Sequence, residues 1–297
     1  MVSPALAREL SLLAGAITPA TAQATMQLLA PCHDMTPPAG MVLMRNLAYG
    51  THPRQVLDVF RPAAEHTAQP VLVFVHGGGF VGGDKCEFGP FYDNIGLWAA
   101  RQGLTGVNIN YRLAPDHPWP AASDDLQSAL QWLARHASPV PQPLRPIVLM
   151  GHSAGASHVA AWVARHGAHA AALGVAGVVL VSGLYDLDAA APTPGRAAYF
   201  GADAAERASR SPLIGLSQAG LPMLLAHAEF DPPENHDQTL RLATACADTP
   251  SGRPLVVDAA GHNHFSTVLQ LGAFETGWSA ALRDFALDRS VTPRRPA

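Results

Sequence analysis

Apolar residues along this chain follow two spacings. Short apolar runs rich in β-branched residues predict buried strands, and stretches with an apolar residue every three or four positions predict helices. Strands are expected at Leu43–Tyr49, Gln55–Phe60, Val71–Val75, Thr105–Tyr111, Ile147–Met150, Gly177–Ser182, Met223–Ala228 and Leu255–Ala259. Helices are expected at Tyr92–Arg101, Asp124–His136, Ala154–His166, Glu234–Ala247 and Phe265–Leu287. This alternation is the signature of an α/β fold with a doubly wound, mostly parallel sheet.

Two segments lie outside this alternation. Residues 3–30 have helical spacing with a restart at Thr18 and Pro19, so residues 1–40 are expected to form an N-terminal helical or cap segment. Leu184–Leu221 is rich in Ala, Pro and Gly and is long for a connection in a compact domain. We therefore expect one domain over residues 1–297, with a small helical lid at 184–221.

Composition excludes some partners. The 297 residues carry a net charge of −4 and only 14% charged residues, with no basic stretch. Nucleic acid and an anionic membrane surface are therefore not expected as partners. No apolar run approaches the roughly 20 residues that cross a bilayer. The three cysteines (Cys32, Cys86, Cys246) are widely spaced, and Glu9 interrupts a stretch that would otherwise resemble a leader, so we expect a cytoplasmic protein.

The strongest chemical signal is Gly151-His152-Ser153-Ala154-Gly155. It fits the G-x-S-x-G pattern, in which a serine sits on a sharp turn between a buried strand and a helix. Here an apolar strand precedes the pattern and a helical stretch follows it. The sequence therefore predicts Ser153 as a nucleophile exposed at a strained turn.

A second glycine-rich segment, His76-Gly77-Gly78-Gly79, follows another predicted buried strand. Glycines in this position let backbone N–H groups approach a substrate oxygen that becomes negatively charged. We expect the amides of Gly77, Gly78 and Ala154 to form an oxyanion hole. His76 is expected to support the loop rather than take part in the chemistry.

The acid and the base should follow the serine in the chain, at the ends of later strands. Asp231 follows the strand Met223–Ala228 and is preferred as the acid over its competing role as a helix cap. Glu229 is the runner-up, and Asp186 and Asp188 are weaker alternatives.

The loop after the last strand holds two histidines, and the residues alone do not decide which is the base. They are His262 and His264. Among the other histidines, His152 is expected to pack inside the turn, whereas His158, His166 and His169 are expected on helix surfaces.

In six stretches the sequence resembles the hormone-sensitive-lipase-like and kynurenine-formamidase-like branch of the α/β hydrolases. They are HGGGFVGGDK (76–85), NYRLAP (110–115), PAASDDLQSALQWL (120–133), GHSAGASHVA (151–160), AEFDPPENHDQ (228–238) and GHNHFSTV (261–268). In the formamidases the catalytic His is followed directly by Phe. The resemblance therefore implies His264 as the base with Asp231 as the acid.

The function expected on this basis is a serine carboxylesterase for small or aromatic esters, with no metal or cofactor. Phe80 and Tyr185 are candidate substrate-binding residues. An arylformamidase or other amide hydrolase is the alternative, although Gly79 and Phe80 stand where formamidases often have an aromatic residue inside the loop. A hydrolase-fold binding protein without activity is a third reading, and a homodimer stays open.

Overall fold

The computed structural model describes residues 2–63, 70–136, 146–249 and 251–288. Eight strands form one sheet in the order β1-β2-β4-β3-β5-β6-β7-β8. Their bounds are β1 (Val42–Ala48), β2 (Val56–Arg61), β3 (Val71–Val75), β4 (Thr105–Ile109), β5 (Ile147–His152), β6 (Val175–Val181), β7 (Met223–Ala228) and β8 (Leu255–Ala259). β2 is antiparallel to both β1 and β4, and the other neighbouring strands pair in parallel. The expected mostly parallel sheet is confirmed.

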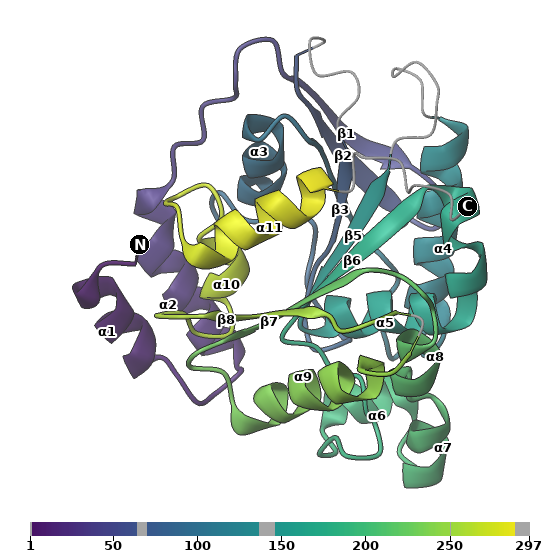
Figure 1. Ribbon diagram of the computed structural model, residues 1–297. Helices are drawn as coiled ribbons and strands as arrows, with labels where there is room; N and C mark the ends of the chain where they lie inside the picture. Colours follow the sequence, from purple (N-terminus) through teal and green to yellow (C-terminus); the bar gives the residue numbers. More distant parts are fainter. Residues whose placement is uncertain (1, 64–69, 137–145, 250, 289–297) are drawn as a thin grey trace.

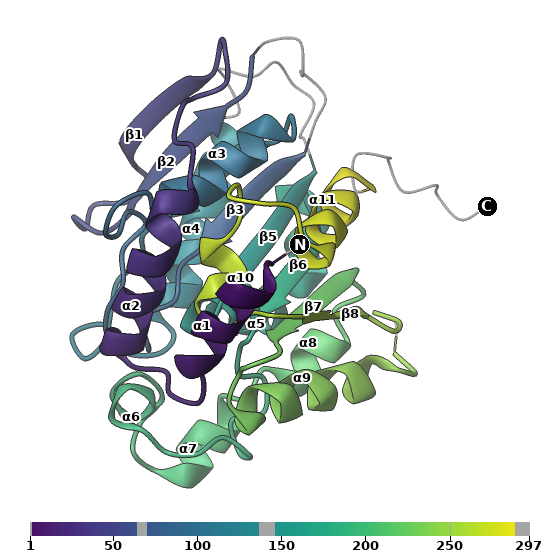
Figure 2. The ribbon, with the colours of Figure 1, turned by 90° about the vertical axis from the view of Figure 1, so that its left-hand side faces the viewer.

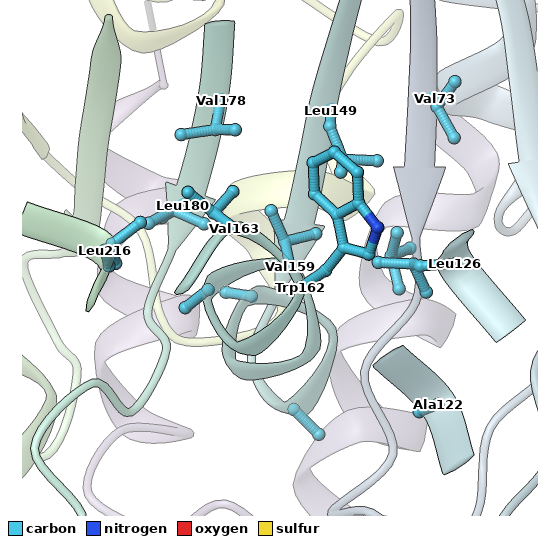
Figure 3. Close-up of a cluster of buried hydrophobic side chains, with 14 of the residues drawn as sticks. Val73, Ala122, Leu126, Leu149, Val159, Trp162, Val163, Val178, Leu180 and Leu216 are labelled. Carbon is cyan, nitrogen blue, oxygen red and sulfur yellow. The ribbon is translucent and has the colours of Figure 1, made fainter. Parts of the chain in front are cut away.

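Helices cover both faces of this sheet (Figure 1). One face carries α4 (Ala121–Arg135), α5 (Ala154–His166), α8 (Leu213–Ser217) and α9 (Pro233–Cys246), and the other carries α3 (Asp93–Arg101), α10 (Ser266–Leu269) and α11 (Gly277–Asp288). A hydrophobic core lies on each face of the sheet. Successive residues of the central strands point alternately into one core and the other, as the strand period of two requires. In the larger core, Trp162 of α5 packs between Leu149 of the sheet and Leu126 of α4 (Figure 3).

The N-terminal segment forms α1 (Pro4–Leu12), α2 (Pro19–Leu29) and the single turn η1 (Ala30–Cys32), which lie beside α10 (Figure 2). The predicted restart is confirmed. The Thr18 side chain accepts from the backbone N–H of Thr21, and the Thr21 hydroxyl accepts from the N–H of Thr18. This capping box begins the second helix.

Residues 184–221 fold into α6 (Pro194–Phe200), α7 (Ala204–Ser209) and α8, after the turn η3 (Gly167–Leu173) and β6. α8 packs against α5 and so belongs to the body of the domain. α6 approaches the glycine-rich loop, because a Cβ built on Gly195 would lie 2.4 Å from the carbonyl oxygen of Gly79. The function of this segment as a lid stays a prediction.

The prediction of a single helix over Phe265–Leu287 is wrong. The chain forms α10 and α11 instead, separated by residues 270–276. The Asn94 side chain donates to the carbonyls of Val268 and Leu271, and Gly272 turns with φ +92°. A second capping pair, in which Thr276 and Ser279 each accept from the other's backbone N–H, then begins α11.

Candidate active site

Ser153 lies at the turn between β5 and α5. Its backbone has φ 55° and ψ −123°, a conformation in which a non-glycine residue is strained. Its N–H donates to the carbonyl of Val181 at 2.8 Å, which fixes the turn to β6. The flanking glycines are required by contact: a Cβ on Gly155 would lie 2.1 Å from the Val75 carbonyl, and one on Gly151 would lie 2.4 Å from the Gly155 carbonyl. The turn therefore has the geometry that its glycine spacing predicts.

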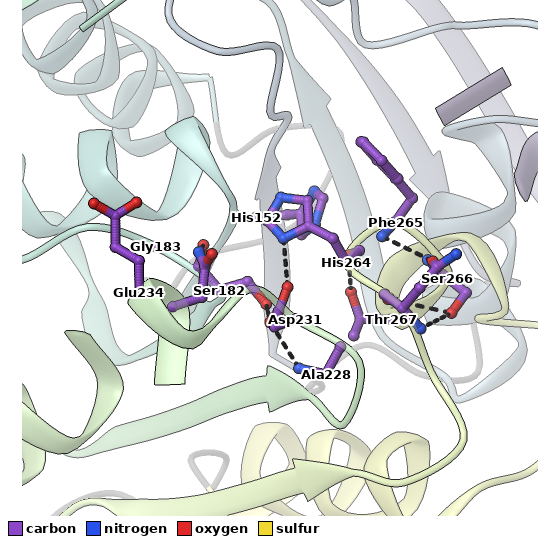
Figure 4. A network of polar contacts seen from close by, with 12 residues as sticks. His152, Ser182, Gly183, Ala228, Asp231, Glu234, His264, Phe265, Ser266 and Thr267 are labelled. Atoms are coloured by element: carbon purple, nitrogen blue, oxygen red, sulfur yellow. Dashed lines mark hydrogen bonds and ion pairs between the residues drawn. The ribbon is translucent and has the colours of Figure 1, made fainter. Parts of the chain in front are cut away.

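His264 and Asp231 are paired in the interior (Figure 4). His264 Nδ1 lies 2.7 Å from Asp231 Oδ1, and both side chains are buried. The other carboxylate oxygen, Oδ2, accepts from the Ser182 hydroxyl at 2.6 Å and from the Ala228 N–H at 2.8 Å. Asp231 follows β7, whereas Ser182 follows β6. Two adjacent parallel strands thus bring the carboxylate and its hydroxyl donor together.

The pKa of Asp231 is lowered from its usual value. Burial alone raises this pKa, but the charge of a protonated His264 and the hydrogen bonds from His264, Ser182 and Ala228 outweigh that effect. The carboxylate therefore stays ionised at neutral pH, and it can stabilise a positive charge on the imidazole.

The alternative residues are engaged elsewhere. His262 Nδ1 lies 3.0 Å from the Ser266 hydroxyl, and Glu229 accepts from the backbone N–H of Gly261. Asp186 pairs with Arg241, and Asp188 is exposed. His264 is therefore hydrogen-bonded to a buried carboxylate, whereas His262 contacts none of the candidate acids through a hydrogen bond of the described residues.

His264 is also joined to the residue next to the serine. His152 Nε2 lies 2.9 Å from the carbonyl oxygen of His264, and the two rings lie 4.9 Å apart. Within the described ranges, His264 Nε2 is buried and has no hydrogen-bond partner. This nitrogen, opposite the one that meets Asp231, is the atom left to exchange a proton with a reacting group.

The glycine-rich loop lies against the serine. A Cβ on Gly77 would be 3.1 Å from Ser153 Cβ and 3.2 Å from the His152 carbonyl oxygen. Gly78 has φ +131°, and a Cβ there would lie 2.0 Å from the Gly82 carbonyl oxygen. In the described part of the chain, none of the amides of Gly77, Gly78 and Ala154 is engaged as a hydrogen-bond donor. All three belong to backbone at or beside the serine.

His76 is hydrogen-bonded to the backbone of the glycine-rich loop. Its Nδ1 lies 2.6 Å from the Gly77 carbonyl, and its own carbonyl accepts from the Tyr111 hydroxyl at 2.8 Å. Burial lowers the pKa of His76 to about 4, so the ring is neutral and donates from Nδ1. In a trans peptide the C=O and the next N–H point in opposite directions. Fixing the Gly77 carbonyl toward His76 therefore turns the Gly78 N–H away from it.

The two candidate substrate-binding residues are both buried. Phe80 packs against Tyr199 and Phe200 of α6. Tyr185 is wholly buried, and its hydroxyl accepts from the backbone N–H of Gly183. These aromatic residues pack beside the glycine-rich loop and the segment after β6, and their contact with a substrate stays a prediction.

The expectation that His158 lies on a helix surface is wrong. Its ring is buried against Phe80, Tyr111 and Tyr199. The helical spacing of α5 did not show this, because α5 is covered on nearly all sides by the sheet, α4 and α8. Of the other two histidines, His169 is exposed and His166 is half-buried. No three His, Cys, Asp or Glu side chains are grouped as a metal ion needs in the ranges described.

The family model described as BD-FAE matches residues 57–245, which include the glycine-rich loop, Ser153 and Asp231. The chain belongs to the BD-FAE family. The matched segment ends before His264, so the base lies in the part of the chain that the family model does not cover.

Curated relatives of this BD-FAE chain match over shorter segments. It is 45% identical over 95 residues to tuliposide A-converting enzyme b1 of Tulipa gesneriana, which is 29% of this chain and 25% of that enzyme. It is 40% identical over 101 residues to esterase LipI of Mycobacterium tuberculosis, covering 32% and 29% of the two chains. The matches therefore span about a quarter of these relatives.

The whole fold is matched by solved structures. The hyperthermophilic esterase of the archaeon Pyrobaculum calidifontis superimposes with a TM-score of 0.69 over 97% of this chain and 98% of that chain, at 22% sequence identity. This likeness confirms the α/β-hydrolase fold expected from the sequence. In the described residues, none of the helices combines the length and apolarity that crossing a membrane demands.

Proposed function

We propose that this chain is a serine carboxylesterase that hydrolyses small or aromatic carboxylic esters. The observation that carries the proposal is the buried 2.7 Å hydrogen bond between His264 Nδ1 and Asp231. His264 is in turn hydrogen-bonded to His152, which precedes Ser153 at the strained turn. The named esterases among the relatives support the same reaction class.

In the proposed reaction, Ser153 Oγ attacks the ester carbonyl carbon while His264 Nε2 takes the hydroxyl proton. Asp231 stabilises the resulting imidazolium. The carbonyl oxygen becomes an oxyanion that accepts hydrogen bonds from the amides of Gly77, Gly78 and Ala154.

The tetrahedral intermediate then collapses. The bond to the alcohol breaks, and His264 gives its proton to the alcohol oxygen. Water then attacks the acyl group on Ser153 while His264 takes its proton. The bond between the acyl carbon and Ser153 Oγ breaks, His264 returns the proton to Oγ, and the carboxylic acid leaves. Each step moves one proton between the imidazole and an oxygen, so the chemistry needs no group beyond these residues and water.

The serine is tested with Ser153→Ala and with Ser128→Ala as the matched control in α4. We expect Ser153→Ala to lower kcat on p-nitrophenyl acetate by on the order of 10⁴ or more and to abolish labelling by a fluorophosphonate. Ser128→Ala should keep both. Near-normal turnover by Ser153→Ala would refute the proposal, and an unlabelled wild-type protein would favour the inactive binding protein.

The base and the bond cleaved are tested separately. His264→Ala should lose far more activity than His262→Ala, because only His264 meets Asp231. Turnover of an aryl ester should exceed that of N-formylkynurenine. The reverse preference would assign the protein to the arylformamidases.

A further inference from the structure

Asn263 stands directly before His264 in the loop Gly261–Ser266, called the base loop below. Its side chain is buried and makes contacts at both ends. Oδ1 accepts from the backbone N–H groups of Phe265 at 3.2 Å and Ser266 at 3.0 Å, the residues at which α10 begins. The Nδ2 amine is thereby turned the other way, toward α2.

There Asn263 Nδ2 donates to Thr25 Oγ1 at 3.0 Å. Thr25 is wholly buried, and its hydroxyl donates its single proton to the Thr21 carbonyl at 2.8 Å. The oxygen therefore presents a lone pair to Asn263, and the donor and acceptor roles are fixed. This contact joins residues 238 positions apart in the sequence.

Other contacts hold the N-terminal segment to the same region. A Cβ built on Gly261 would lie 3.3 Å from Val2 Cβ and 3.5 Å from Ala7 Cβ, so α1 covers the start of the base loop. His33 Nε2 lies 2.7 Å from the carbonyl of Leu269 at the end of α10. The N-terminal segment thus contacts the base loop at Gly261 and Asn263, and contacts α10 at Leu269.

We propose that Thr25 is a positioning residue for His264, acting through the side chain of Asn263. This inference rests on the proposed function, in which His264 is the base. The Thr25 hydroxyl fixes the Asn263 carboxamide, the carboxamide fixes the backbone on both sides of His264, and the imidazole is thereby held toward Ser153.

Loss of the hydrogen bond between Asn263 and Thr25 is expected to displace His264. A buried N–H donor left without its acceptor is unfavourable, so the Asn263 side chain would rotate toward another partner. Its Oδ1 would then leave the N–H groups of Phe265 and Ser266, and the backbone at His264 would shift. A displacement of about 1 Å in a catalytic group can lower the rate by roughly a hundredfold.

The test compares Thr25→Val, which has the same shape without the hydroxyl, with Thr25→Ser, which keeps it. The matched control is Thr239→Val. Thr239 is also buried in a helix, and its hydroxyl donates to the carbonyl four residues earlier, as Thr25 does. Among the described residues, that hydroxyl has no hydrogen bond to the base loop. Steady-state kinetics on p-nitrophenyl acetate, the rate of fluorophosphonate labelling and thermal unfolding are measured for each.

We expect Thr25→Val to lower kcat by roughly ten- to a hundredfold with KM within about twofold of wild type. Labelling of Ser153 should slow in parallel. Thr25→Ser should recover most of kcat. Thr239→Val should keep wild-type kcat even where it lowers the unfolding temperature, because its lost hydrogen bond lies within one helix.

Three results would overturn the inference. They are a folded Thr25→Val with wild-type kcat, an equal loss of kcat in Thr239→Val, and a Thr25→Ser variant no better than Thr25→Val. If Thr25→Val does not fold, Thr25→Ala and Thr25→Ser are compared in the same way, and equal kcat values refute it. A wild-type protein that neither turns over the ester nor takes the label refutes the proposed function itself.

Discussion

His152 Nε2 and the backbone carbonyl of His264 are 2.9 Å apart, which joins the turn at Ser153 to the loop of its proposed base. A carbonyl only accepts, so His152 carries its proton on Nε2. Burial, and then the charge of a protonated His264, lower the pKa of His152 to about 3. The ring is therefore a neutral donor across the working range of pH.

We predict that His152→Leu lowers kcat by roughly tenfold or more, because the His264 backbone loses a donor on the side of Ser153. It should also destabilise the fold by roughly 1 kcal/mol, since the buried carbonyl then keeps only the hydrogen bond from the Thr267 hydroxyl. His152→Gln, which retains an N–H donor, should lose less of both. Urea unfolding and steady-state kinetics measure the two effects, and equal kcat values for the two variants would contradict the assigned hydrogen bond.

Gly77 and Gly79 differ in what surrounds them, although both belong to the glycine-rich loop. A Cβ on Gly77 would meet Ser153 Cβ at 3.1 Å, whereas one on Gly79 has no neighbour within 4 Å. Gly77→Ala should therefore lower kcat by on the order of a hundredfold with little effect on stability, because it displaces the proposed oxyanion donors from the serine.

The control for this prediction is Gly79→Ala. Gly79 has φ +60°, so alanine there is strained by about 1–2 kcal/mol, a cost that falls on stability. The pair should thus separate, with Gly77→Ala impaired mainly in kcat and Gly79→Ala mainly in unfolding temperature. The opposite pattern would place the oxyanion donors elsewhere in the loop.

Four buried histidines make the fold sensitive to acid. Burial lowers the pKa of His76 and His262 to about 4, and of His152 and His158 to about 3. In the unfolded chain an imidazole takes up its proton near pH 6.5. Between pH 6.5 and 4 the unfolded state therefore binds protons that the native state does not, and stability falls as the pH falls.

The size of this loss can be measured. Each such histidine contributes up to about 1.4 kcal/mol per pH unit, so the four together reach about 5 kcal/mol per pH unit near pH 5. His158→Leu should reduce the slope of unfolding free energy against pH by about one histidine's share. A flat profile between pH 6.5 and 5 would contradict the burial of neutral imidazoles.

The order of strands and helices was determined by local pattern. β3, β7, β8 and α5 have the bounds that the spacing of apolar residues predicts, although Leu255 and Val256 of the edge strand β8 are exposed. Ser153 was also found locally, since the glycines that allow its turn lie two residues away on either side. Spacing in the sequence and contact in space coincide at this turn.

The pattern failed where long-range contacts decide. The break between α10 and α11 depends on Asn94, a side chain from a helix more than 170 residues earlier that binds the carbonyls at the end of α10. His158 is buried against Tyr199 of α6, whose position cannot be inferred from the spacing along one helix.

The sequence by itself determined that an acid and a histidine follow Ser153, because each follows a recognisable strand. It left His262 and His264 equal on the residues alone. Only the tertiary structure brings Asp231 within hydrogen-bond distance of His264, and only the tertiary structure brings Thr25 to Asn263. The physical reason is that a hydrogen bond depends on the distance and direction between two atoms, and folding sets both for residues far apart in the chain.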